Sequence, residues 1–141
     1  MADTRDIFAS HGLRCTRQRD QLYRALAATR SHPTAEELYE SVRRDCPGLS
    51  LATVYNTLDA FCRVGLCIRL PSATASGPCR FDAETERRVH VALDDGRVLD
   101  APMDVSNRIL AGLADEDIRE LERRMGVSIT RVQLQMVAAK A

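Results

Sequence analysis

The most regular hydrophobic pattern of the chain begins after Ser50. Apolar side chains then recur every three or four positions, at Leu51, Val54, Leu58, Phe61 and Cys62. This period predicts an amphipathic helix that turns one face to a core, with Ser50 as its N-cap and Gly65 at its end. The apolar run 66–70 follows and predicts a short strand. A helix, a glycine and a strand in this order are typical of the end of a winged helix-turn-helix.

Three shorter helices are predicted before this one. Thr4 can cap a first helix that ends near Gly12, and Thr16 can cap a second helix. Residues 34–37 have the sequence Thr-Ala-Glu-Glu, which is a capping box. We therefore expect a third helix to begin there and to end at the Pro-Gly pair 47–48.

The pattern changes after residue 70. Residues 71–78 are small and polar and predict a loop or hinge. Beyond them we expect two strands around the turn 94–96, a helix that Gly126 closes, and a last strand. The ranges of these four elements are 89–93, 97–99, 115–125 and 127–138.

Together these elements predict a mixed α/β (α+β) fold. The expected parts are a winged helix-turn-helix domain in 1–70, a hinge in 71–78, and a small α/β dimerisation and regulatory domain in 79–141. Two domains of about 70 residues each bury little core alone. We therefore expect the second domain to form a homodimer.

The charges are balanced in number but not in position. Twenty basic and twenty acidic residues give a net charge of zero, which argues against indiscriminate binding of polyanions. Residues 14–30, however, carry five arginines and a single aspartate, and acidic residues gather in the C-terminal half. This division suits a protein whose N-terminal part meets nucleic-acid phosphates. A solvated arginine face is the alternative interpretation.

Several function classes are not expected. No segment resembles a signal peptide, and no apolar run approaches the ~20 residues of a membrane span, so we expect a cytoplasmic protein that does not bind membranes. Five cysteines are present, none in a C-x-x-C pair; we expect them to be reduced and Cys62 to lie in the core. With three histidines and no catalytic constellation, we expect no enzyme activity.

The helix after Ser50 begins with polar side chains that could meet DNA. Thr53, Tyr55 and Asn56 lie near its start, where a recognition helix places the side chains that reach base edges. The alternative is that Tyr55 is half-buried packing and that Asn56 is a surface amide.

Six ordered segments of the chain together resemble the ferric uptake regulator family. They are 12–19, 32–39, 52–58, 65–66, 80–82 and 96–100. Asn56 and the triplet of Arg80, Phe81 and Asp82 look most like the peroxide-sensing subgroup. The resemblance implies a homodimeric, metal-responsive transcription repressor that binds an inverted-repeat operator in double-stranded DNA.

The resemblance also implies DNA-contacting residues. Tyr55 looks like the residue that packs on a thymine methyl group, a contact available in the major groove. Asn56 looks like the neighbour that contacts a base edge or a phosphate. Arg14, Arg17 and Arg19 resemble basic residues that position the protein on the DNA backbone without reading sequence.

The family usually carries a structural zinc ion on two C-x-x-C pairs, and this chain departs from that pattern. Residues 92–95, where the first pair is expected, are Ala-Leu-Asp-Asp, and no second pair occurs up to Ala141. A tetrahedral cysteine site cannot form from these residues. We therefore expect no structural zinc.

A regulatory metal site is partly retained. His32, Asp82, His90 and Asp100 match the ligand pattern of the peroxide-sensing subgroup, and Arg88 stands where that pattern has a further histidine. Two histidines and two aspartates suit one Mn, Fe or Zn ion. If the pattern is aligned from Gly96 instead of Asp82, His90 no longer matches a ligand position. The alternatives are therefore that His32 is a loop histidine and that His90 faces solvent from a strand.

Two further interpretations stay open at this point. Arg88 could pair directly with Asp82 or Asp100 and replace the metal. The protein would then be a metal-independent regulator, or a thiol-responsive one that uses Cys15, Cys67 or Cys79. It could also be a heterodimerising partner that modulates a metal-dependent relative.

Overall fold

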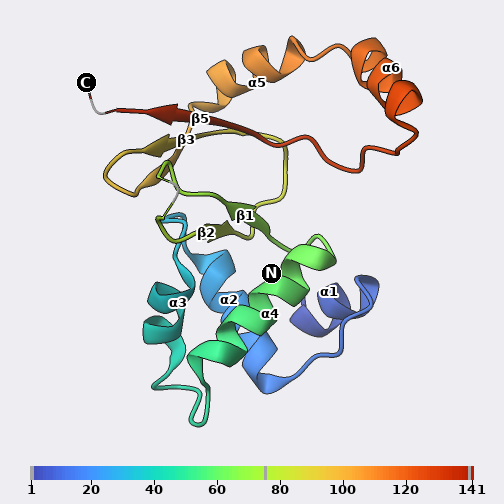
Figure 1. Cartoon of the computed structure of the whole chain (residues 1–141). Coiled ribbons are helices and arrows are strands. Elements are labelled where there is room, and N and C mark those ends of the chain that lie inside the picture. The colour runs from blue at the N-terminus through green and yellow to red at the C-terminus, as the bar shows by residue number, and fades with distance from the viewer. Residues whose placement is uncertain (1, 75, 140) are drawn as a thin grey trace.

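The computed structural model describes residues 2–74, 76–139 and 141. The elements in chain order are α1 (Thr4–Ser10), α2 (Arg17–Ala28), α3 (Ala35–Val42), α4 (Leu51–Arg63), β1 (Ile68–Leu70), β2 (Arg80–Asp82), β3 (Val89–Leu93), β4 (Val98–Asp100), α5 (Met103–Ala111), α6 (Asp115–Met125) and β5 (Leu134–Ala138). Figure 1 shows α1–α4 at one end of the molecule, α5 and α6 with the sheet of β3–β5 at the other, and β1 and β2 between them. The predicted mixed fold is confirmed.

The predicted caps of α2, α3 and α4 are confirmed. In each case a side-chain oxygen accepts a backbone N–H three residues further on, and Glu37 completes the capping box of α3; the caps are Thr16, Thr34 and Ser50. The prediction for α1 was wrong by one residue. Asp3 caps this helix through the N–H of Arg5, because the buried Thr4 hydroxyl donates to Asp20 instead.

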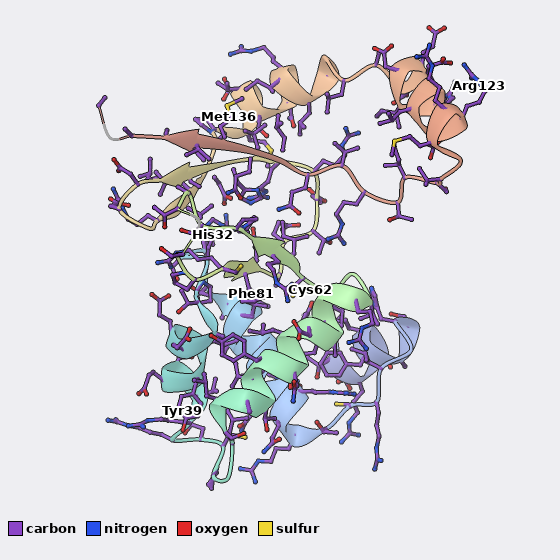
Figure 2. The ribbon with its side chains drawn as sticks, in the orientation of Figure 1. His32, Tyr39, Cys62, Phe81, Arg123 and Met136 are labelled. Atoms are coloured by element: carbon purple, nitrogen blue, oxygen red, sulfur yellow. The ribbon has the colours of Figure 1, made fainter. Side chains whose placement is uncertain are left out.

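Helices α1–α4 pack around one apolar cluster. Its centre is aromatic, since the ring centroids of Phe8, Tyr23 and Phe61 lie 5.6–5.8 Å apart. The apolar face of α4 is buried in this cluster, as its period predicted. Phe81 of β2 packs into the same cluster, and Figure 2 places it against the helices. The strand pair is therefore fixed to the helical part.

Strands β1 and β2 form an antiparallel hairpin, with Arg69 opposite Phe81. Strand β1 was predicted to begin at residue 66 but begins at Ile68. Gly65, at φ 81°, ends α4, and the N–H of Leu66 still donates to the carbonyl of Phe61 and so belongs to the helix end. Residues 71–79 join β1 to β2, and residues 83–88 lead on to the second sheet. The division into domains at 71–78 stays a prediction.

Strand β3 is the centre of the second sheet. Strand β4 pairs with it antiparallel, with His90 opposite Asp100, and β5 pairs with it parallel, with His90 beside Gln135. The last strand was predicted to begin at residue 127 but begins at Leu134. In the intervening segment the N–H of Ile129 donates to the Glu122 carboxylate rather than to a neighbouring strand.

Helix α5 was not predicted, whereas α6 has its predicted bounds. No side chain caps α5, and Pro102 precedes it, so the usual signal of a helix start is missing. Its buried Ser106 accepts the N–H of Val89 and ties the helix to β3. Helix α6 ends at Gly126, which is left-handed at φ 65°. No helix among residues 2–74 and 76–139 is long and apolar enough to cross a membrane.

Candidate metal centre and DNA-binding surface

Four titratable side chains meet between the helical part and the second sheet. His32 precedes α3, Asp82 ends β2, His90 lies on β3 and Asp100 ends β4. One ligand atom from each lies within 4.8 Å of all the others, and no other such group of three or more His, Cys, Asp or Glu occurs in the described part of the chain. Figure 2 shows His32 between the helices and the second sheet.

The ligand atoms face one centre in an alternating arrangement. His32 Nε2 lies 3.3 Å from Asp82 Oδ2 and 3.2 Å from Asp100 Oδ1. His90 Nε2 lies 3.4 Å and 3.2 Å from the same two oxygens. Two nitrogens and two oxygens thus surround the centre. His32 and His90 are 3% and 1% exposed, so neither faces solvent.

The remaining polar atom of three of these side chains is held by the protein, whereas His90 Nδ1 is buried without a hydrogen-bond partner among the described residues. His32 Nδ1 donates to the carbonyl of Val98 at 2.7 Å, so the neutral ring has its lone pair on Nε2. Asp82 Oδ1 accepts the N–H of Glu84 at 2.8 Å. Asp100 Oδ2 accepts Arg88 Nη1 at 3.0 Å. Each of these three residues therefore offers one atom to the centre.

Arg80 fixes the backbone that carries His32. Its Nη1 donates to the His32 carbonyl at 2.9 Å, and its Nε donates to the Gly96 carbonyl at 2.7 Å. His32 has a positive φ of 53°, and it is the only non-glycine residue in the described ranges with a positive φ. Such a conformation is strained and persists only where its surroundings hold it. The hairpin, the His32 loop and the second sheet are joined through this one guanidinium.

The arrangement shifts the pKa of Asp82 and that of His32. Burial tends to raise the pKa of Asp82, but hydrogen bonds with His32 and His90 outweigh it and hold this pKa well below its usual range. Burial tends to lower the pKa of His32, but its hydrogen bonds to Asp82 and to the Val98 carbonyl raise the pKa above its usual value. Each shift favours the charged form of its group, the carboxylate of Asp82 and the imidazolium of His32.

An unpaired carboxylate oxygen points into the centre. Asp100 Oδ1 is buried and has no aligned hydrogen bond among the described residues, although both Nε2 atoms lie 3.2 Å away. An unsatisfied buried acceptor costs free energy, and a divalent cation would satisfy it. A cleft of about 410 Å³, lined by His32, Asp82, Arg88 and Asp100 among others, leads to these atoms.

A second hollow, of about 340 Å³, lies where α2 meets α4. Its lining includes Arg14, Arg19, Thr53 and Asn56, which were predicted to contact DNA. Arg19 also donates to the carbonyl of Arg14 at 2.9 Å, which orders this basic edge. Two other predicted contacts lie outside this lining. Tyr55 is exposed and donates to Glu36, and Arg17 donates to the carbonyl of Asp45.

Known proteins share this sequence pattern and fold. The pattern of the ferric uptake regulator family matches residues 10–136. The chain belongs to this family. The peroxide-responsive repressor PerR of Staphylococcus saprophyticus is 35% identical over 101 residues, which are 71% of this chain and 67% of that protein. PerR of Staphylococcus aureus (strain Mu50) is 36% identical over 90 residues, 63% of this chain and 60% of that protein.

The architecture agrees with that of solved ferric uptake regulators. The structure of the regulator from Pseudomonas aeruginosa with manganese superimposes with a TM-score of 0.69 at 24% identity, over 99% of this chain and 98% of that one. At this identity the similarity shows the fold. The family consists of transcription regulators, so the chain is placed among these and not among enzymes by its membership.

Some residues at the two sites of this ferric uptake regulator family member were not predicted from the sequence. Gln18 and Thr57 line the hollow of α2 and α4, and their positions beside Arg19 and Asn56 were a usable signal. Arg80 was noted as part of a motif, but its hydrogen bonds to two distant carbonyls had no signal in the sequence. Arg88 pairs with Asp100 and not with Asp82.

Proposed function

We propose that this protein is a transcription repressor that binds an inverted-repeat operator as a homodimer and responds to a divalent cation. The observation that carries this proposal is the common centre of His32, Asp82, His90 and Asp100. These ligands come from the helical part, the hairpin and the second sheet. A cation held by all four stabilises the arrangement in which these parts meet, by as much as its affinity for that arrangement exceeds its affinity for others.

The separations of the ligand atoms suit a four-coordinate cation. The four nitrogen–oxygen distances are 3.2–3.4 Å, and all four atoms lie within 4.8 Å of one another, which is the scale set by metal–ligand bonds of about 2.0–2.2 Å. Both carboxylates have one oxygen bound to a protein donor and so offer the other alone. Zn, Fe and Mn accept this set of ligands. Since residues 92–95 lack cysteine, no structural zinc is proposed.

A metal-independent repressor is the second candidate, and the ion pair of Arg88 with Asp100 favours it. The two side chains are only 12% and 28% exposed, and their atoms lie 3.0 Å apart. The guanidinium therefore already supplies positive charge to one carboxylate. It occupies the outer oxygen Oδ2, however, and leaves Oδ1 and both Nε2 atoms facing the centre. This arrangement supports the cation-binding candidate more strongly.

The DNA-binding role rests on α4 as the recognition helix. Thr53 and Asn56 lie in the first turns of α4 and share a hollow with Arg14 and Arg19. We propose that Asn56 contacts a base edge and that the arginines contact phosphates. Tyr55, 42% exposed on the same helix, is proposed to contact a thymine methyl group.

Asn56→Ala is expected to weaken operator binding by about 1–3 kcal/mol and to leave binding to random duplexes nearly unchanged. Arg14→Ala is expected to weaken both equally and to reduce the salt slope by about one unit. Arg123→Ala on the exposed α6 is the control, since Figure 2 places it at the opposite end of the molecule. Mobility shifts on an operator selected from random duplexes measure these effects. Equal losses on both duplexes for Asn56→Ala would exclude base reading.

The homodimer is proposed to form through α6 and β5. Helix α6 buries no residue in the single chain, yet it exposes Leu121 and Met125, and β5 exposes Met136 and Val137. Strand β5 is also an edge of its sheet. Apolar side chains on an uncovered helix and strand fit an interface between copies.

Leu121→Glu is expected to raise the dimer dissociation constant by at least ~10-fold, because each of the two leucines, 48% exposed in the single chain, loses about half of the 1.5–3 kcal/mol of full burial. Sedimentation velocity at micromolar concentration measures this change. Arg119→Glu, an exposed charge reversal on the same helix, serves as control for charge alone. A wild-type monomer under these conditions would contradict the proposed dimer.

A further inference from the structure

Two cysteine side chains touch at the end of the recognition helix. Cys62 lies in the last turn of α4, and Cys67 directly precedes β1. Their Sγ atoms are 3.2 Å apart, and both thiols are free. A disulfide bond measures about 2.05 Å between sulfurs, so the two atoms need to approach by only about 1.1 Å. Figure 2 shows Cys62 where α4 meets the β1–β2 hairpin.

The two thiols differ in access and surroundings. Cys62 is half-buried, whereas Cys67 is fully buried and donates weakly to the carbonyl of Leu58 at 3.9 Å. Two guanidinium groups lie near the pair. Arg69 is paired with Asp59, and Arg131 lies over the turn, since a Cβ atom built on Gly65 would meet its Nη2 at 3.5 Å.

These surroundings separate the acidities of the two thiols. The contact with Cys67 and the positive charges of Arg69 and Arg131 lower the pKa of Cys62. The contact with Cys62 and burial raise the pKa of Cys67. A partly exposed, more acidic thiol beside a second thiol is the usual arrangement of an oxidisable cysteine and its resolving partner.

We propose that Cys62 and Cys67 form an oxidative modification site, at which hydrogen peroxide converts the two thiols into an intramolecular disulfide. The Cys62 thiolate attacks one peroxide oxygen; the S–O bond forms, the O–O bond breaks, and the hydroxide released takes up the proton that Cys62 lost. Cys67 Sγ then attacks Cys62 Sγ, forming the S–S bond and breaking the S–O bond. The second hydroxide leaves with the proton of Cys67. Two thiols are oxidised, and one peroxide is reduced to two waters.

The position of this pair gives the modification a consequence, which rests on the proposed function. The disulfide would join the last turn of α4, across Gly65, to the residue that directly precedes β1. The N-terminal half of the same helix carries Thr53 and Asn56. Oxidation is therefore expected to lower operator affinity, independently of the metal centre.

The chemistry can be tested on the free protein without DNA. The full-length Cys46→Ser protein is treated with hydrogen peroxide in the presence of a chelator, so that metal-catalysed oxidation does not contribute. Remaining thiols are alkylated, and the tryptic peptides are analysed by mass spectrometry. Cys62 then lies alone in peptide 45–63 and Cys67 in peptide 64–69. The expected product is these two peptides joined, with the loss of two hydrogens.

Variants separate the two roles. Cys62→Ser should prevent the joined product, and Cys67→Ser should leave a sulfenic acid on Cys62 that a dione reagent traps. Cys79→Ser, at another half-buried cysteine, should behave as the parent. Cys62 is expected to react on the order of tenfold faster than Cys15 or Cys79. Equal rates at the three sites, or a disulfide without Cys67, would overturn the proposal.

Operator binding is measured separately on the oxidised and re-reduced protein. A disulfide that leaves operator affinity unchanged would refute the regulatory consequence and leave the modification site standing. If the reduced protein binds no selected duplex at all, the proposed function fails, whereas the peroxide result still decides the chemistry of the pair.

Discussion

His90→Ala is expected to lower the affinity of the purified protein for Zn²⁺ by at least ~100-fold, since changing even the groups that orient a ligand costs about 10–100-fold. His90 supplies one of four ligand atoms and is 1% exposed, so no solvent group replaces it directly. Operator binding should fall with it, as it should when a chelator is added to the unaltered protein. Competition with a chromophoric chelator and mobility shifts measure the two effects.

His11→Ala is the matched control for this experiment. Of the three histidines of the chain, His11 is the one outside the site. It is exposed at the end of α1, and its Nδ1 donates a hydrogen bond to the carbonyl of Ile7. Its replacement should leave both affinities unchanged. Unchanged Zn²⁺ affinity in His90→Ala would rule out the four-residue site. A loss of Zn²⁺ without any change in operator binding would retain the site and reject the response.

Arg88→Met should destabilise the metal-free protein by about 1–3 kcal/mol, less than the 3–5 kcal/mol of a fully buried ion pair because Asp100 is partly exposed. Saturating Zn²⁺ should restore most of this loss, since the cation neutralises Asp100 in place of the guanidinium. The stabilisation by a given Zn²⁺ concentration is thus expected to be larger in the variant. Denaturant unfolding with and without Zn²⁺ measures both quantities.

The neighbouring Arg87 provides the control for this prediction, because it is exposed. Arg87→Met should change neither the metal-free stability nor the gain from Zn²⁺. If Zn²⁺ stabilises the Arg88→Met variant and the parent equally, the guanidinium and the cation do not both neutralise the charge of Asp100. If Zn²⁺ stabilises neither protein, the metal-independent repressor becomes the better description.

The elements that follow strong local signals could be predicted from the sequence. Helix α4 combines a serine cap, a regular apolar face and a closing glycine, and each of these features acts within a few residues. Helix α5 lacks a capping side chain and is stabilised by contact of Ser106 with β3. Such a tertiary contact leaves no local pattern. The start of β5 was missed for the same reason, because pairing with β3 decides where the strand begins.

The candidate site was predicted through motif spacing rather than through local structure. The pattern suggested which residues belong together but not which atoms face the centre. The register of β3 and β4, which sets His90 opposite Asp100, decides this, together with the hold of Arg80 on the His32 carbonyl. The approach of Cys62 to Cys67 was also missed. The period of α4 assigned Cys62 to the core, whereas the turn at Gly65 brings the second sulfur back to it.

The parallel pairing of β3 with β5 also bears on the order of assembly during synthesis. Strand β3, which carries His90, obtains its second neighbour only from residues 134–138, more than forty positions later. The contacts within α1–α4, by contrast, can form as soon as residue 63 has been made. Pairings between distant segments close slowly, and chains fold from the N-terminus as they are made. The helical cluster is therefore expected to mature first, and the His90 strand to be secured last.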